Sequence, residues 1–99
     1  MPEILLTFHC ARRDTETVTE AIRAVSNAPI HLCEKTVRGW DFGDARTAEK
    51  VAGLLQRNAL ELIVAEDDLS QLLQAVTEAR RTLPVRWHAV PIVARGRIE

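Results

Sequence analysis

Three arginines near the end of the chain have side chains suited to binding an anion. They are Arg86, Arg95 and Arg97. A guanidinium group makes planar, two-pronged contacts with phosphate or carboxylate, and Gly96 allows a ligand to approach the backbone closely. The alternative is that these arginines are solvated or paired with acidic residues of the chain. The residue types favour a small anionic ligand at this end of the sequence.

Histidine and cysteine side chains form a second candidate site, for a metal ion. His31 and Cys33 are two residues apart on a predicted strand, so both project from the same face. Imidazole and thiolate suit zinc or copper. His9 and His88 are expected to lie close, because their strands are neighbours in the fold predicted below. However, the chain has no C-x-x-C or H-x-x-x-H pattern, and single histidines and cysteines are often simply packed.

The sequence supports catalysis and RNA binding less well than it supports anion or metal binding. Cys10 follows His9, and neighbours on a strand point to opposite faces, so they cannot form a nucleophile–base pair. No nucleotide-binding glycine fingerprint or nucleophile elbow is present. The run R-G-W-D-F at 38–42 imitates an RNA-recognition motif, but it enters a loop, where Asp41 and Asp44 repel phosphate. We expect neither an enzyme nor a nucleic-acid-binding protein.

Hydrophobic patterns predict the elements that position these side chains. Strands are predicted at residues 3–10, 30–38, 59–65 and 85–93. Asp14 or Thr15 is predicted to cap a first helix, which carries an apolar stripe made of Val18, Ala21, Ile22 and Val25. A second long helix has acidic residues at its start and Arg80 and Arg81 at its end, which suits the helix dipole. Its apolar stripe is made of Leu69, Leu72, Leu73 and Val76.

The middle of the chain is predicted to be a turn followed by a short helix. The turn-forming residues run from Gly39 to Gly43, and Asp44 opens the helical stretch. One face of this short helix is formed by Ala48, Val51, Ala52 and Leu55. The resulting β-α-β, connector, β-α-β order predicts one α+β domain over residues 1–99, a ferredoxin-like split βαβ-βαβ sandwich.

In that fold the helices cover only one face of the sheet. The other face should be polar in a monomer. However, the third strand carries apolar residues at both its odd-numbered and its even-numbered positions, which point to opposite faces. The fourth strand likewise offers Val90 and Ile92 on one parity and Val85, Trp87 and Ala89 on the other. We predict that another copy of the protein covers the open face.

Composition restricts the class of protein. The chain has 99 residues, is 46% hydrophobic and 27% charged, and has a formal charge of -1. This balance is typical of one globular domain and provides no electrostatic footprint for nucleic acid or a membrane surface. Residues 1–8 lack the pattern of a signal peptide, and no apolar run is long enough to span a bilayer. With two cysteines and no sign of secretion, we expect reduced thiols and a cytoplasmic location.

The sequence resembles the PII-like superfamily. Residues 37–81 are similar to PII signalling proteins. The similar stretches are V-R-G-W, then A-E-K-V-A-G-L-L, then L-E-L-I-V-A-E-D-D-L-S-Q-L-L-Q-A-V-T-E-A-R-R. Residues 48–53 and 87–97 resemble more closely a family of uncharacterised PII-like bacterial proteins, often encoded beside heavy-metal efflux pumps. The segment P-V-R-W-H-A-V-P-I is similar to divalent-cation-tolerance proteins of the CutA type.

The resemblance implies a homotrimer that senses or regulates and does not catalyse. PII proteins bind adenine nucleotides at subunit clefts and contact transporters, enzymes or regulators through the loop after the second strand. Together with the arginines named above, the candidate ligand-binding set is Arg38, Gly39, Trp40, Arg86, Arg95 and Arg97. The implied mechanism is ligand-dependent ordering of residues 39–47, with a membrane transporter or regulatory protein as partner.

The sequence also departs from the PII pattern. Trp40 follows the loop-base Gly39 where PII proteins have glutamine, and the chain has no tyrosine. The loop T-L-P-V-R at 82–86 has no glycine where PII proteins have a glycine-rich phosphate loop. These departures argue against close backbone contact with the phosphates of ATP. The alternative function is that of a CutA-like metal-binding protein in heavy-metal tolerance, with His31, Cys33, His9 and His88 as ligands.

Overall fold

The structure, a computed structural model, describes residues 2–38 and 54–99 and places four strands in one antiparallel sheet. The two central strands are β1 (Glu3–Ala11) and β3 (Leu54–Ala65), and the two edge strands are β2 (His31–Arg38) and β4 (Arg86–Pro91). The order across the sheet is β2-β3-β1-β4. This is the order of the ferredoxin-like βαβ-βαβ fold, so the predicted fold class is confirmed.

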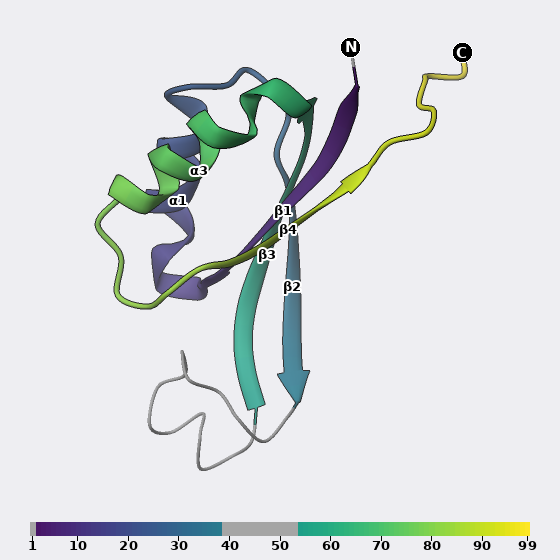
Figure 1. Cartoon of the computed structure of the whole chain (residues 1–99). Helices are drawn as coiled ribbons and strands as arrows, with labels where there is room; N and C mark the ends of the chain where they lie inside the picture. Colours follow the sequence, from purple (N-terminus) through teal and green to yellow (C-terminus); the bar gives the residue numbers. More distant parts are fainter. Residues whose placement is uncertain (1, 39–53) are drawn as a thin grey trace.

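Two helices lie together on one face of the sheet (Figure 1). They are α1 (Thr15–Arg23) and α3 (Leu69–Glu78), and a short 3-10 turn precedes each, at Arg12–Asp14 and Glu66–Asp68. Each helix buries two residues of its predicted apolar stripe, which are Val18, Ile22, Leu72 and Val76. The two halves of the chain therefore repeat one strand–turn–helix unit.

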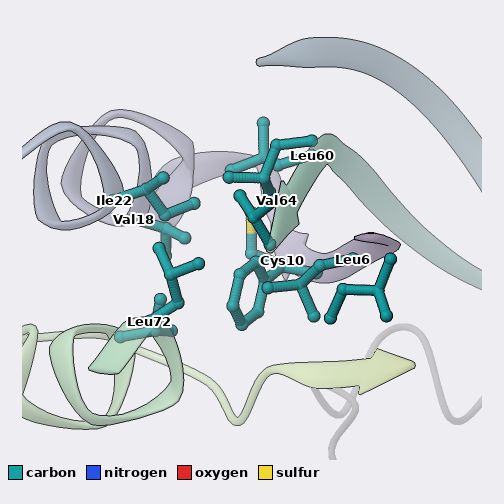
Figure 2. Close-up of a cluster of buried hydrophobic side chains, with 11 residues drawn as sticks. Leu6, Cys10, Val18, Ile22, Leu60, Val64 and Leu72 are labelled. Carbon is teal, nitrogen blue, oxygen red and sulfur yellow. The ribbon is translucent and has the colours of Figure 1, made fainter. Parts of the chain in front are cut away.

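The core lies between the helices and the sheet (Figure 2). In Figure 2, apolar side chains of α1 and α3 face those of the two central strands. Even-numbered residues of β1 and β3 supply the strand side of this core, which consists of Ile4, Leu6, Phe8, Cys10, Leu60, Leu62 and Val64. Strict alternation along both strands sends the odd-numbered side chains to the open face.

Strand β3 is longer than the sequence predicts. It begins at Leu54, whereas the prediction began at residue 59, because β2 pairs with its first residues as far as Arg38 opposite Leu54. Leu55 was expected on a helix and instead lies in this strand, opposite Val37. That end of the predicted short helix is wrong, since hairpin pairing outweighs a short helical pattern. Residues 44–53 of the predicted helix lie outside the described residues.

Asp14 has a different role from the predicted helix cap. Its side chain makes no cap hydrogen bond to α1. Instead, the carboxylate of this buried residue accepts hydrogen bonds from the backbone N–H and hydroxyl of Thr82 and from the N–H of Leu83, at 2.9–3.1 Å. The start of α1 is thereby fastened to the loop between α3 and β4.

The last residues of the chain leave the sheet. After β4 the backbone N–H of Ile92 still donates to the carbonyl of Glu3 at 2.9 Å. Beyond it the chain runs away from the body of the molecule to the C-terminus (Figure 1). Val93 and Ile98 on this tail are completely exposed, at 100% and 101%. None of the helices in the described ranges is long and apolar enough to span a bilayer.

Candidate functional site

A hollow of about 360 Å³ lies where the open face of the sheet meets the tail. Residues directly opposite each other in an antiparallel pair share a face, so Leu5, Ile63 and Glu61 all belong to the open face. The described residues that line the hollow are Leu5, Ala28, Pro29, His31, Glu61, Leu62, Ile63 and Arg95. The walls therefore combine an aliphatic surface with a guanidinium, a carboxylate and an imidazole.

Arg95 enters this hollow from the tail, and its guanidinium already holds a carboxylate. Its Nε and Nη2 atoms donate to the two carboxylate oxygens of Glu3, both at 2.9 Å. The ion pair lowers the pKa of Glu3, chiefly through the hydrogen bond, and raises that of Arg95. Arg97 makes a similar two-pronged contact with Glu99, at 2.7 and 3.2 Å, and does not line the hollow.

The remaining anion-binding candidates lie at the opposite end of the sheet. Arg86 pairs in register with His9, and Arg38 is the last residue of β2. Arg95 contacts Glu3, six positions along β1 from His9, which is about 20 Å of extended strand. One chain therefore does not bring these arginines into one site. Gly39 and Trp40 lie outside the described residues.

The histidine and cysteine candidates share the open face but form two separate pairs. The rings of His9 and His88 stack with centroids 5.4 Å apart, as the sequence predicted for these neighbouring strands. His31 and Cys33 lie together on β2, opposite Glu61 and Ala59 of β3. Among residues 2–38 and 54–99 no group of three or more His, Cys, Asp or Glu side chains is placed to hold a metal ion.

The charges around His9 disfavour its protonation. Partial burial lowers the pKa of His9, and the positive charge of Lys35 and the neighbouring His88 add to this effect, with only Glu61 opposing it. The imidazole of His9 is therefore neutral near pH 7 and stacks on His88 without charge repulsion. Neutral imidazole is also the form that binds metals.

Cys10 is placed as a core residue. It is fully buried, and its Sγ lies 3.8 Å from the hydroxyl of Thr15 and donates to the carbonyl of Asn58 at 3.7 Å. Burial raises the pKa of this thiol, so it stays protonated and unreactive at neutral pH. Cys33 is exposed, and both cysteines are free.

The sequence patterns single out His31 and Arg95 as site residues but none of the other residues of the hollow. Glu61 is the clearest case, because it is a single charge inside the apolar run A-L-E-L-I-V-A. Glu61 and Ile63 are two residues apart on the strand, so both side chains point to the open face. A charged residue within an otherwise apolar central strand is the signal that would have found it. Glu3 and Leu5 carry no such signal.

Comparison with known proteins defines the family. The profile of the DUF3240 family, described as proteins of unknown function, matches residues 1–99. The chain belongs to the DUF3240 family. A solved DUF3240 protein from Shewanella baltica OS155 has a TM-score of 0.74 and 15% sequence identity, over 98% of this chain and 97% of that chain. No curated protein matches the sequence.

Two further solved structures place this DUF3240 chain in a wider fold group. CutA1 from Oryza sativa has a TM-score of 0.68 and 15% identity, over 97% of this chain and 84% of its own. PII from Arabidopsis thaliana, solved bound to citrate, has a TM-score of 0.65 and 14% identity, over 91% and 74%. Similarity at this level of identity shows the fold alone, and it confirms the PII-like resemblance of the sequence.

Proposed function

We propose that the protein is a PII-like regulatory or sensor protein of the cytoplasm, which binds a small anionic ligand and does not catalyse a reaction. The observation that carries this proposal is the hollow on the open face, into which the tail brings Arg95. The ligand site is a cleft between subunits of a homotrimer, so each chain supplies only part of it.

Exposed apolar side chains support the assembly. On the open face Val90 is 44% exposed, and on the tail Val93 and Ile98 are completely exposed. Leu5 and Ile63 on the same face are only half-buried. A face and an extended tail of this composition gain free energy by packing against another copy of the chain.

The separation of the arginines supports a cleft built from two subunits. Arg38 and Arg86 lie at one end of the sheet and Arg95 lies at the other. A site that uses both groups needs the tail end of one subunit to meet the opposite end of its neighbour. Arg97, which pairs with Glu99, and Gly39 and Trp40 complete the proposed ligand-binding set.

The geometry favours a carboxylate over a triphosphate as the anionic group. Arg95 already grips the carboxylate of Glu3 with two hydrogen bonds, and a ligand carboxylate reproduces that contact by replacing it. In the loop before β4, by contrast, the N–H groups of Thr82 and Leu83 are taken by Asp14, and Pro84 has none. The known citrate complex of Arabidopsis thaliana PII is a precedent for a small polycarboxylate on this fold.

Signalling in this proposal uses the segment between β2 and β3. Residues 39–47 lie outside the described residues, and in this proposal their ordering on ligand binding leads to contact with a partner such as a membrane transporter. Gly39 and Gly43 supply the hinges, and Trp40 reports the change. Arg38, at the end of β2, links the segment to the sheet.

Isothermal titration calorimetry tests the ligand site. We expect citrate to bind the wild-type protein, and Arg95→Gln to weaken binding by about tenfold or more, since a charged hydrogen-bonded contact is lost. Glu16→Gln, on an exposed position of α1, serves as a control and retains full affinity. ATP and inorganic phosphate are titrated in parallel. If no anion binds, or if Arg95→Gln binds as tightly as the wild type, the proposed site is wrong.

The stacked pair His9–His88 favours a second candidate function, binding of zinc or copper in heavy-metal tolerance. A single chain offers two separate histidine and cysteine pairs on one face, so this candidate also depends on the assembly to complete the ligand set. It predicts metal uptake that is lost in His88→Ala or in Cys33→Ser. Equal uptake by the wild type and both variants, measured by elemental analysis, would exclude these ligands.

A further inference from the structure

An unpaired carboxylate lies in the middle of the open face. Glu61 is half-buried on the central strand β3, with Thr7 opposite it on β1 and His31 opposite it on β2. Among the described residues it makes no hydrogen bond or ion pair, and it acts on His9 only through its charge. Withdrawing a carboxylate from water without a partner costs free energy, so this side chain is suited to a cationic group other than those of the described residues.

The neighbouring hydroxyl is also unpaired. Thr7 is 0% exposed, and its Oγ1 atom has no hydrogen-bond partner among residues 2–38 and 54–99. It lies directly opposite Glu61 on one side and His88 on the other, on the same face of the sheet. Buried polar atoms without partners are rare in folded proteins. Glu61 and Thr7 are therefore two adjacent polar side chains for which the described part of the chain supplies no hydrogen-bond partner.

The charges of the hollow are mixed. At one side lies the guanidinium of Arg95, which makes two hydrogen bonds to the carboxylate of Glu3. At another side Glu61 presents a carboxylate, and Leu5 and Ile63 form the aliphatic wall. A ligand that carries only negative charge gains from Arg95 but is repelled by Glu61. A ligand with both charges satisfies both sides.

We infer that the ligand of this hollow carries an amine as well as a carboxylate, as amino acids do. This inference rests on the proposed function and specifies its ligand class. The ligand carboxylate takes the place of Glu3 on Arg95, and the ammonium donates hydrogen bonds to Glu61. The remainder of the ligand packs against Leu5 and Ile63.

Matched pairs of compounds that differ only in the amine test this inference. The pairs are aspartate with succinate and leucine with 4-methylpentanoate, titrated by calorimetry into the full chain. We expect the amine-bearing member of at least one pair to bind about tenfold more tightly than its partner, as a charge-assisted hydrogen bond predicts. Glu61→Gln, a substitution of nearly equal shape, removes that difference. Glu16→Gln, an exposed carboxylate on α1, leaves it unchanged.

The outcomes separate this inference from the proposed function. If each pair binds with equal affinity and Glu61→Gln changes neither, the amine requirement is wrong and the carboxylate site on Arg95 stands. The same holds if citrate binds and none of the four compounds does. If no anion of either experiment binds, both the inference and the proposed function are contradicted. Circular dichroism of Glu61→Gln establishes that the variant is folded.

Discussion

Asp14 shows how one buried side chain joins parts of the chain that are far apart in the sequence. Its carboxylate accepts hydrogen bonds from Thr82 and Leu83, 68 and 69 residues away. The sequence predicts a polar residue at this position, because a helix begins there, but it does not predict the partners. Helix capping is a local pattern, whereas this contact exists only once the two halves of the fold pack together.

Replacing Asp14 tests this contact. We expect Asp14→Ala to lower the free energy of unfolding by about 3 kcal/mol, because it removes the charge-assisted hydrogen bonds from Thr82 and Leu83 to a buried carboxylate. Asp67→Ala, an exposed carboxylate in the turn before α3, should change it by less than about 0.5 kcal/mol. Urea unfolding followed by circular dichroism measures both. Equal stabilities of the two variants would show that the hydrogen bonds of Asp14 to Thr82 and Leu83 do not stabilise the fold.

The lowered pKa of His9 predicts a loss of stability in acid. At pH values well above the ordinary histidine pKa of about 6.5, the imidazole is neutral in both the folded and the unfolded chain. As the pH falls below that value, the unfolded chain binds a proton before the folded chain does, so the free energy of unfolding decreases until the folded pKa is passed.

Urea unfolding at pH 7.5 and pH 5 measures this effect. His9→Gln removes the titrating group, and we expect the decrease between the two pH values to be smaller in this variant than in the wild type. His31→Gln, on an exposed position of the same face, provides the comparison for removal of a histidine. A decrease that is the same in the wild type and His9→Gln would contradict the assignment.

At the scale of elements, the sequence predicts the four strands, the two long helices and the stripe that each helix buries. These follow from local patterns with periods of 2 and 3.6 residues. The start of β3 does not, because residues 54–56 pair with β2 alone. The hollow could not be predicted either, since it forms where the tail, β1, β2 and β3 meet.

The end of α3 illustrates a predicted cation whose contacts the structure defines. The guanidinium of Arg81 donates to the carbonyls of Val76, Thr77 and Leu83, at 3.1, 3.4 and 3.2 Å. Carbonyls in the last turn of a helix have no partner within the helix. The side chain therefore ends α3 and orders the loop that follows.

The adjacent arginines provide a matched test. We expect Arg81→Ala to lower the free energy of unfolding by about 1–2 kcal/mol, through loss of hydrogen bonds from a charged group. Arg80→Ala, at the neighbouring position, should change it by less than about 0.5 kcal/mol. Thermal and urea unfolding of the two variants compare them directly. A larger effect at Arg80 than at Arg81 would contradict the capping role.

At the scale of the whole molecule, the two described helices cover the same face of the sheet. The helices pack on the even-numbered side chains of β1 and β3, and the odd-numbered side chains point to the other face, away from the helices (Figure 1). Apolar residues of both parities in β3 already indicate this arrangement in the sequence. We therefore expect the assembled trimer, rather than the single chain, to be the functional unit.

Two exposed apolar residues on opposite faces of the sheet test the assembly. Val90 is 44% exposed on the open face, and Leu32 is 57% exposed on the helix-facing side of β2. We expect Val90→Asp to dissociate the trimer, because it places a charge in the interface. Leu32→Asp should leave the trimer intact. Sedimentation velocity measures the oligomeric state, and a trimer that persists in Val90→Asp would contradict the covered open face.

Native mass spectrometry of the full chain with citrate added tests the central claim most directly. Our account predicts a trimer that binds about one citrate per subunit, and an Arg95→Gln trimer that binds little or none. A trimer of both proteins with equal citrate binding would contradict the role of Arg95. A monomer, or a trimer that takes up no citrate or other anion, would contradict the account of this protein as a ligand-binding PII-like assembly.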